Sequence, residues 1–99
     1  MNEKMDKKQY VVVTTEHKGV FGGYGPDAPD ADGRIVLTDA RMCIYWHESV
    51  RGVTGLAAVG PIGASRVSPK VPRLTLTGVT SVMVATPEAA EQWEKGTWK

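Results

Sequence analysis

The chain has 99 residues, of which 41% are hydrophobic and 23% charged, and 12 Lys and Arg residues nearly balance 11 Asp and Glu. This length fits one domain, and a formal net charge of +1 leaves no basic excess for tight, sequence-independent nucleic-acid binding and no acidic excess for DNA mimicry. The 11 glycines and 6 prolines disfavour a helical bundle and favour short strands joined by turns.

The N-terminal residues Met1–Lys8 are charged, and no apolar signal segment follows them. We therefore expect a disordered tail over residues 1–9 and a single β-rich domain over residues 10–99. The single cysteine, Cys43, excludes an internal disulfide, cannot build a zinc site alone, and lies in an apolar run that predicts an inert buried thiol. No apolar run approaches the roughly 20 residues of a membrane helix, so we expect a soluble, cytoplasmic protein without membrane contact.

The N-terminal half is predicted to form strands. Residues 10–15 are rich in β-branched side chains, a turn follows at residues 17–19, and residues 20–24 form an antiparallel second strand. Glycines inside that second strand indicate a bulge or a group that closely approaches the backbone. After a loop over residues 25–33, strands are expected at 34–38 and 41–47, separated by a tight corner at Asp39-Ala40.

The C-terminal half mixes helix and strand. Apolar residues at helical spacing predict a short helix over residues 49–59, although two glycines each weaken it by about 1 kcal/mol relative to alanine. An edge strand is expected at 65–71, with further strands at 74–76 and 79–85. Thr86, Pro87, Glu88 and Gly96 predict the ends of a C-terminal helix. The whole pattern predicts a mainly β (α+β) fold, a small SH3-like barrel or β-roll with a short middle helix and a C-terminal helix.

Motifs for phosphate and metal binding are incomplete. Residues 23–28 match the spacing of a dinucleotide fingerprint, but proline and acidic residues follow where a helix should begin, and the glycine pairs at 52–55 and 60–63 lack the Gly-Lys-Ser/Thr ending of a phosphate loop. Asp30, Asp32 and Asp39 fit three calcium-loop positions, yet Ala28 occupies the first-ligand position. A solvated turn is the favoured interpretation, and cation binding by these aspartates stays open.

Catalytic groups are scarce as well. His47-Glu48, with Ser49 or Cys43 as nucleophile, is the one candidate, but neighbouring residues on a strand point to opposite faces. Cys43 and His47 share a face but lie roughly 13 Å apart along the strand, too far for a nucleophile and its base. We therefore predict that the protein is not an enzyme and needs no cofactor.

The aromatic strand at 41–47 is the strongest candidate for binding. Arg41 and Tyr45 share a face, and a guanidinium beside a ring can hold a phosphate, a nucleobase or a carboxylate; alternatively, Arg41 covers the barrel rim and pairs with Asp39. Trp98 either folds back onto the barrel or anchors a subunit contact. Arg66, Lys70 and Arg73 form a modest basic edge. The predicted ligand-binding residues are Phe21, Gly22, Gly23, Tyr24, Arg41, Tyr45, Trp46, His47 and Trp98.

Several segments together resemble a family of small domains of unknown function encoded by phages and prophages. The resemblance rests on residues 20–24, 35–41, Tyr45-Trp46, Leu56-Ala57, Gly60, 71–79 and the ending Trp98-Lys99. It implies a compact, β-rich, SH3-like fold and a phage setting, and it supplies no catalytic residue. The chain departs from the pattern in its longer loop over residues 25–32 and in His47-Glu48, where small residues are usual.

Two functional classes follow from these observations. The first is a non-enzymatic anti-defence protein in the host-cell cytoplasm, which sequesters a small nucleotide-like signal or blocks a host defence protein. We expect a sequestering protein to be a homo-oligomer with pockets at its subunit interfaces. The second class is a virion accessory or structural interaction module, or a weak nucleic-acid binder that uses the basic edge; nucleic acid is the less favoured partner.

Overall fold

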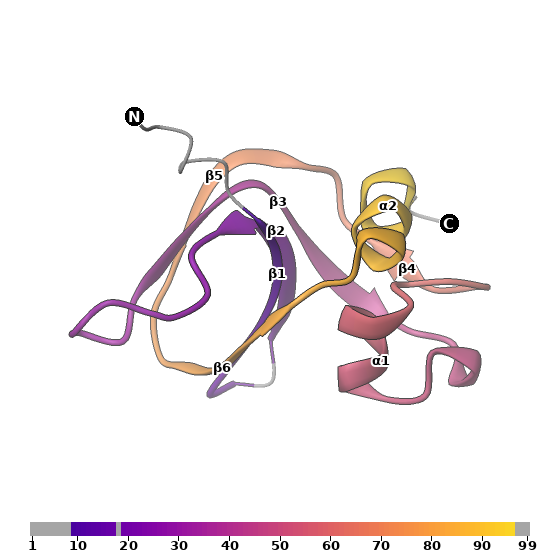
Figure 1. Ribbon diagram of the computed structural model, residues 1–99, viewed down its shortest axis with the longest axis horizontal. Coiled ribbons are helices and arrows are strands. Elements are labelled where there is room, and N and C mark those ends of the chain that lie inside the picture. The colour runs from indigo at the N-terminus through magenta and orange to yellow at the C-terminus, as the bar shows by residue number, and fades with distance from the viewer. Residues whose placement is uncertain (1–8, 18, 97–99) are drawn as a thin grey trace.

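The computed structural model describes residues 9–17 and 19–96, and Figure 1 shows a curved sheet with its helices gathered at one end. Residues 1–8 of the predicted tail, Lys18 of the predicted turn and Trp98 lie outside the described residues. Gln9, predicted to belong to the tail, is the first residue of a strand. The strands are β1 (Gln9–Thr15), β2 (Val20–Gly25), β3 (Ile35–Tyr45), β4 (Arg66–Val67), β5 (Val71–Leu76) and β6 (Val79–Val84), and the helices are the 3-10 helix η2 (Glu48–Val50), α1 (Val53–Ala58) and α2 (Pro87–Lys95).

The sheet is antiparallel and curved, with the strand order β4-β3-β2-β1-β6, and β5 pairs with β3. A turn of two residues, Thr77-Gly78, joins β5 to β6, although these strands pair with β3 and β1 respectively. No ladder joins β5 to β6 in the described sheet, so the curve does not close into a barrel. The mainly β, α+β prediction is confirmed, and the sheet is an open one.

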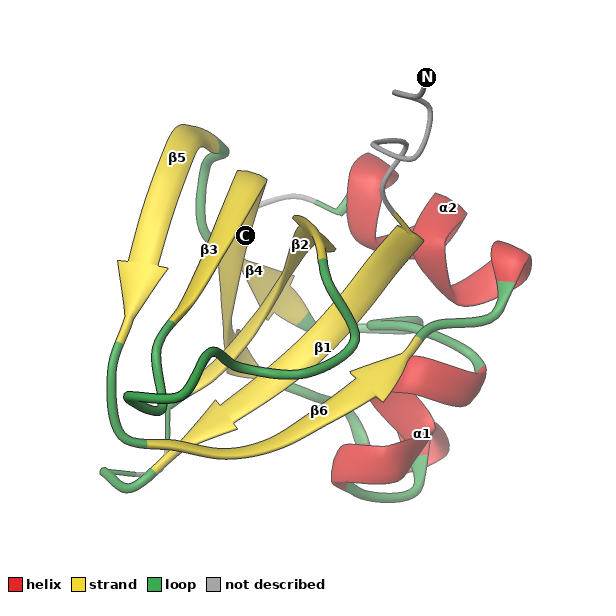
Figure 2. Ribbon diagram, turned by 60° about the vertical axis from the view of Figure 1, so that its left-hand side comes forward, coloured by secondary structure: helices red, strands yellow, loops and turns green. Residues whose placement is uncertain are grey.

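The strand β1 explains how so small a chain builds two cores. Its side chains alternate between the faces of the sheet: Tyr10 and Val12 pack toward α1 and α2, whereas Val11 and Val13 pack inside the curve. Both sets are buried, which is why the strand reads as a continuous apolar run without alternation. In Figure 2 both α-helices lie together on one side of the sheet, where they cover the first of these cores.

Three element boundaries differ from the sequence prediction. The two strands expected at 34–38 and 41–47 are one strand, because Asp39 adopts a positive φ of 49° and β3 keeps pairing with β5 on both sides of it. The middle helix is split into η2 and α1 by Arg51 and Gly52, whose φ values are 71° and 93°. The strand expected at 65–71 is interrupted at residues 68–70, and Pro72 lies within β5.

The C-terminal helix was predicted correctly. Thr86 Oγ1 accepts a hydrogen bond from the Ala89 N–H at 3.0 Å, and Pro87 occupies the first turn. Trp93 is fully buried on the inner face of α2, and its Nε1–H donates to Leu56 O at 3.0 Å, which ties α2 to α1. No helix in the described residues is long and apolar enough to cross a membrane.

Candidate functional site

Arg41 lies beneath the C-terminal end of α2 and is 8% exposed. Its Nε–H donates to Ser68 O at 2.8 Å, and its two terminal nitrogens donate to the carbonyls of Trp93 (2.8 Å), Glu94 (3.1 Å) and Gly96 (2.7 Å). The last carbonyls of a helix have no partner within it, and a cation at that end also complements the helix dipole. Arg41 is therefore a cap for α2.

This position corrects both expectations for Arg41. The guanidinium donates four hydrogen bonds to backbone carbonyls beneath α2. It therefore does not face a ligand beside Tyr45. Among the described residues it forms no ion pair with Asp39 either. Residue spacing predicted that Arg41 and Tyr45 share an open face, but the helix end that covers Arg41 comes from more than fifty residues further along the chain.

The glycines of β2 allow close approach, as predicted, but the approaching groups belong to the protein. A Cβ added to Gly22 would lie 2.7 Å from the ring of Trp93, and one added to Gly23 would lie 3.0 Å from the Cβ of Leu37. Phe21 is half-buried and packs on the core inside the curve of the sheet. These three predicted ligand-binding residues therefore serve packing: the space above the two glycines is filled by other side chains, and the Phe21 side chain contributes to the core.

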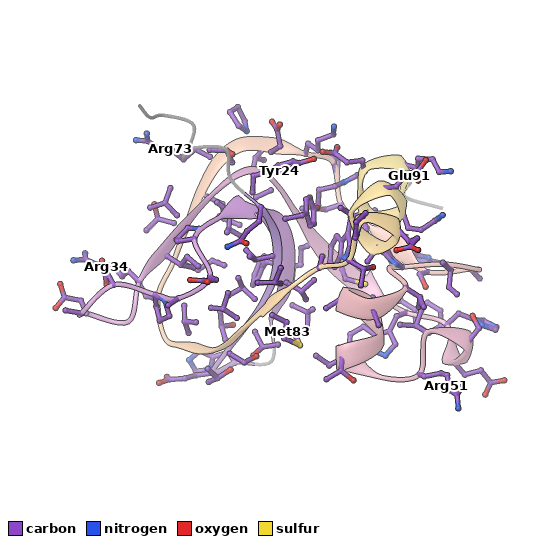
Figure 3. All side chains as sticks on the ribbon, in the orientation of Figure 1. Tyr24, Arg34, Arg51, Arg73, Met83 and Glu91 are labelled. Atoms are coloured by element: carbon purple, nitrogen blue, oxygen red, sulfur yellow. The ribbon has the colours of Figure 1, made fainter. Side chains whose placement is uncertain are left out.

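Tyr24 joins β2 to α2 through a polar cluster that includes Tyr10, Lys70 and Glu94. Its ring meets that of Tyr10 edge to face at 4.9 Å, and its hydroxyl donates to Glu94 Oε2 at 2.6 Å. Lys70 Nζ donates to the other oxygen of Glu94, also at 2.6 Å. Burial, the hydrogen bond to Glu94 and the charge of Glu94 together raise the pKa of Tyr24 to about 12. Figure 3 shows Tyr24 at the top of the sheet, on the side toward α2.

The other members of this cluster respond to the same surroundings. Burial acts to raise the pKa of Glu94, but the hydrogen bonds from Lys70 and Tyr24 and the charges of Lys70 and Arg41 outweigh it and hold that pKa below its ordinary value. Burial, with the charge of Glu94 second, raises the pKa of Tyr10. The Tyr10 hydroxyl is buried and has no hydrogen-bond partner among the described residues. Tyr24 and Glu94 lie 70 residues apart, so no local pattern in the sequence predicts their contact.

Tyr45, in contrast, faces outward at the end of β3. Cys43 pairs with Val67 and Tyr45 pairs with Arg66, so β3 carries one extra residue, Ile44, at this point. The irregularity turns two successive large side chains outward: Ile44 is 44% exposed and Tyr45 is 50% exposed. Arg66 is exposed as well, directly across the ladder from Tyr45. We call Ile44, Tyr45 and Arg66 the bulge face.

Trp46 and His47 leave β3 toward the helices. Trp46 is half-buried and packs against the core beneath α1 and α2. His47 caps η2: its Nδ1 accepts from the Ser49 N–H at 3.1 Å and lies 3.0 Å from Ser49 Oγ, and its own backbone N–H donates to Ser65 Oγ at 2.9 Å. The structure thus brings His47 and Ser49 together, in a cap. Cys43 is buried, and burial raises the pKa of its thiol to about 11, as expected for an inert cysteine.

The acidic loop is organised by its own hydrogen bonds. Asp30 Oδ1 accepts from the N–H groups of Asp32 and Arg34, both at 2.9 Å, and the backbone bond from Arg34 is the main cause that lowers the pKa of Asp30. Arg34 also pairs with Asp32 at 3.0 Å, and Figure 3 shows it at the tip of this loop. Within the described residues no three His, Cys, Asp or Glu side chains are grouped so as to hold a metal ion.

Open depressions in the described part of the surface include one near each end of the sheet. One of about 160 Å³ lies between the loop after α1 and the end of α2, and Ile62, Ser65, Gln92 and Lys95 contribute to its lining. The other, of about 390 Å³, lies between the acidic loop and the start of β3, with a lining that includes Pro26, Pro29 and Val36. Neither contains a residue of the predicted ligand site. The bulge face contains Tyr45, a predicted ligand-binding residue that is exposed, and is therefore the candidate functional surface.

Comparison with known proteins identifies the family of the chain. The family described as Domain of unknown function (DUF6948) matches residues 8–93, which include all the described strands and most of α2. No curated protein and no solved structure matches the chain. Because the match covers most of the sequence, the chain belongs to the DUF6948 family.

Proposed function

We propose that this protein is a non-enzymatic binding protein of a phage or prophage, and that it blocks a host defence protein through the bulge face. The observation that carries the proposal is the irregularity in β3, which exposes Ile44 and Tyr45 side by side. A buried tyrosine would contribute to folding alone, whereas an exposed tyrosine beside an aliphatic side chain and an arginine has the composition of a protein-binding hot spot.

The geometry favours protein binding over capture of a nucleotide by one copy of the chain. Arg41 and the glycines of β2 were the predicted nucleotide-binding residues. Arg41 instead contacts the end of α2, and the glycines contact core side chains. The larger depression is lined mostly by apolar residues, and Arg34, the one cation in its lining, is already paired with Asp30 and Asp32. The resemblance to phage-encoded domains supports the anti-defence setting.

The test is a plating assay in bacteria that each carry one defence system. We expect the wild-type chain to restore plating of a restricted phage in one such strain, and Ile44→Asp and Tyr45→Ala to lose this effect. Val36→Asp is the matched control, because Val36 lies on the same strand, is 43% exposed, and is outside the bulge face. Restoration that survives both bulge-face variants would refute the surface assignment.

Two binding measurements on the purified protein separate the alternatives. A nucleotide that raises the melting temperature in proportion to the logarithm of its concentration would favour sequestration of a nucleotide-like signal. Binding to DNA that weakens steeply with salt would favour the interaction module that uses Arg66, Lys70 and Arg73. Lys70 is already paired with Glu94, so we expect any such DNA binding to be weak.

A further inference from the structure

The edge strands of the sheet are protected unequally against pairing with another chain. β4 has only two residues and begins with Arg66, and β5 carries Pro72 and Arg73; short length, proline and charge all discourage such pairing. The third edge strand, β6, has six residues with neither a charge nor a proline. Its last residue, Val84, is 51% exposed, more than any other large hydrophobic side chain in the described part of the chain.

The ladder with β1 determines which backbone groups of β6 point outward. The Ala85 N–H donates to Tyr10 O at 2.9 Å, in the register that pairs Val84 with Val11 and Val82 with Val13. Hydrogen-bonded and non-hydrogen-bonded pairs alternate along an antiparallel ladder, so the N–H and C=O groups of Val82 and Val84 face away from β1.

This outer side is open along most of the strand. Within β6, the described residues show one backbone hydrogen bond outside the ladder, from the Val79 N–H to Gly33 O at 3.4 Å, at the opposite end from Val84. Figure 2 shows β6 as the outermost strand on its side of the sheet.

We propose that β6 pairs with the same strand of a second copy of this chain, antiparallel about a two-fold axis at Met83. This register sets Val82 opposite the partner's Val84 and Val84 opposite the partner's Val82, so that every outward N–H and C=O of these residues is paired, in four hydrogen bonds. A second copy is the fitting occupant because an isologous contact brings equivalent segments together, and a charged strand would meet like charges there. The strand β6 (Val79–Val84) contains no charged residue, so this repulsion does not arise.

This dimer is independent of the proposed function. In the strand order β4-β3-β2-β1-β6, the bulge face and β6 belong to opposite ends of the sheet, so pairing through β6 leaves Ile44 and Tyr45 exposed. The dimer can therefore be right or wrong whatever the bulge face binds.

Sedimentation equilibrium of the full chain over a range of concentrations tests the pairing. We expect a reversible dimer, and we expect Val84→Pro to weaken association at least about tenfold, because the two-fold axis doubles the loss of the outward N–H. A proline whose nitrogen faces away from β1 leaves the ladder within the monomer intact. Val84→Thr is the control, since it keeps the N–H and the β-branched shape, and we expect it to dimerise.

Amide hydrogen exchange of the wild-type protein gives a second readout that needs no variant. We expect the Val82 and Val84 amides to exchange more slowly as protein concentration rises, while the amide of Arg73, which belongs to β5 and not to the paired strand, does not change. A wild-type chain that stays monomeric would overturn the proposal. So would a dimer that Val84→Pro leaves intact, or exchange at Val82 and Val84 that is independent of concentration.

Discussion

Replacing Arg41 with methionine should be among the most destabilising single substitutions in this protein. The change keeps a long side chain but removes the donors to four carbonyls, those of Ser68, Trp93, Glu94 and Gly96. A hydrogen bond from a charged donor contributes about 1.5–3 kcal/mol, and a buried acceptor left without a partner costs about 1–3 kcal/mol.

The magnitude follows from how well water can replace the lost donors. The bond to Trp93 O is fully buried, whereas the other three are partly exposed and can be rehydrated in part. Counting the buried bond fully and the others in part gives a loss of about 3–5 kcal/mol. A domain of this size is stable by about 5–15 kcal/mol, so Arg41→Met should remove a large fraction of its stability.

Urea unfolding followed by tryptophan fluorescence and extrapolated linearly to water measures this loss. Arg41→Lys should retain less than half of the stabilisation, because one ammonium group cannot reach carbonyls on both sides of the guanidinium. Arg73→Met is the control: Arg73 is an exposed arginine on β5, and we expect a change within about 0.5 kcal/mol. A loss below about 1 kcal/mol for Arg41→Met would refute the capping role.

Three further predictions concern the surroundings of α2. Tyr10→Phe should leave the free energy of unfolding unchanged or raise it by up to about 1 kcal/mol, because it deletes a buried hydroxyl without a partner; a loss above about 1 kcal/mol in urea unfolding would mean that the hydroxyl is bonded. Gly22→Ala should destabilise by about 1–3 kcal/mol, since its methyl group would lie 2.7 Å from the Trp93 ring, and an unchanged melting temperature would contradict this packing. Glu94 has a lowered pKa in the folded state, so its contribution to stability is present above its ordinary pKa of 4.5 and is lost as pH falls through the lower, folded value. Unfolding measured from neutral to acidic pH should therefore show a smaller loss of stability below pH 4.5 for Glu94→Gln than for the wild type, and parallel profiles would rule out this linkage.

Local signals in the sequence were sufficient for the elements whose ends are set by neighbouring residues. Thr86 and Pro87 start α2 because a side-chain cap and a fixed proline φ act within one turn of helix. The β-branched run before Thr15 forms β1 for the same kind of reason. The corner expected at Asp39 did not form, because pairing with β5 extends β3 through a backbone conformation that the sequence pattern does not reveal.

The candidate site depended almost entirely on tertiary structure. Residue types and strand alternation identified the aromatic strand, and Tyr45 does face solvent there. Arg41 and Gly22 are used by the end of α2 and by Trp93, contacts that join residues far apart in the chain and leave no local signal. The extra residue that exposes Ile44 depends on the register between β3 and β4, which is set by packing across the sheet.

The sequence by itself determined the fold class, the C-terminal helix and the near balance of charge, because composition and short-range backbone preferences act within a few residues. The tertiary structure decided which polar and aromatic side chains remain available to a partner. A strand residue becomes a cap, a core contact or a binding residue according to what packs over it, and in this protein α2 covers Arg41 and Gly22 but leaves Ile44 and Tyr45 exposed.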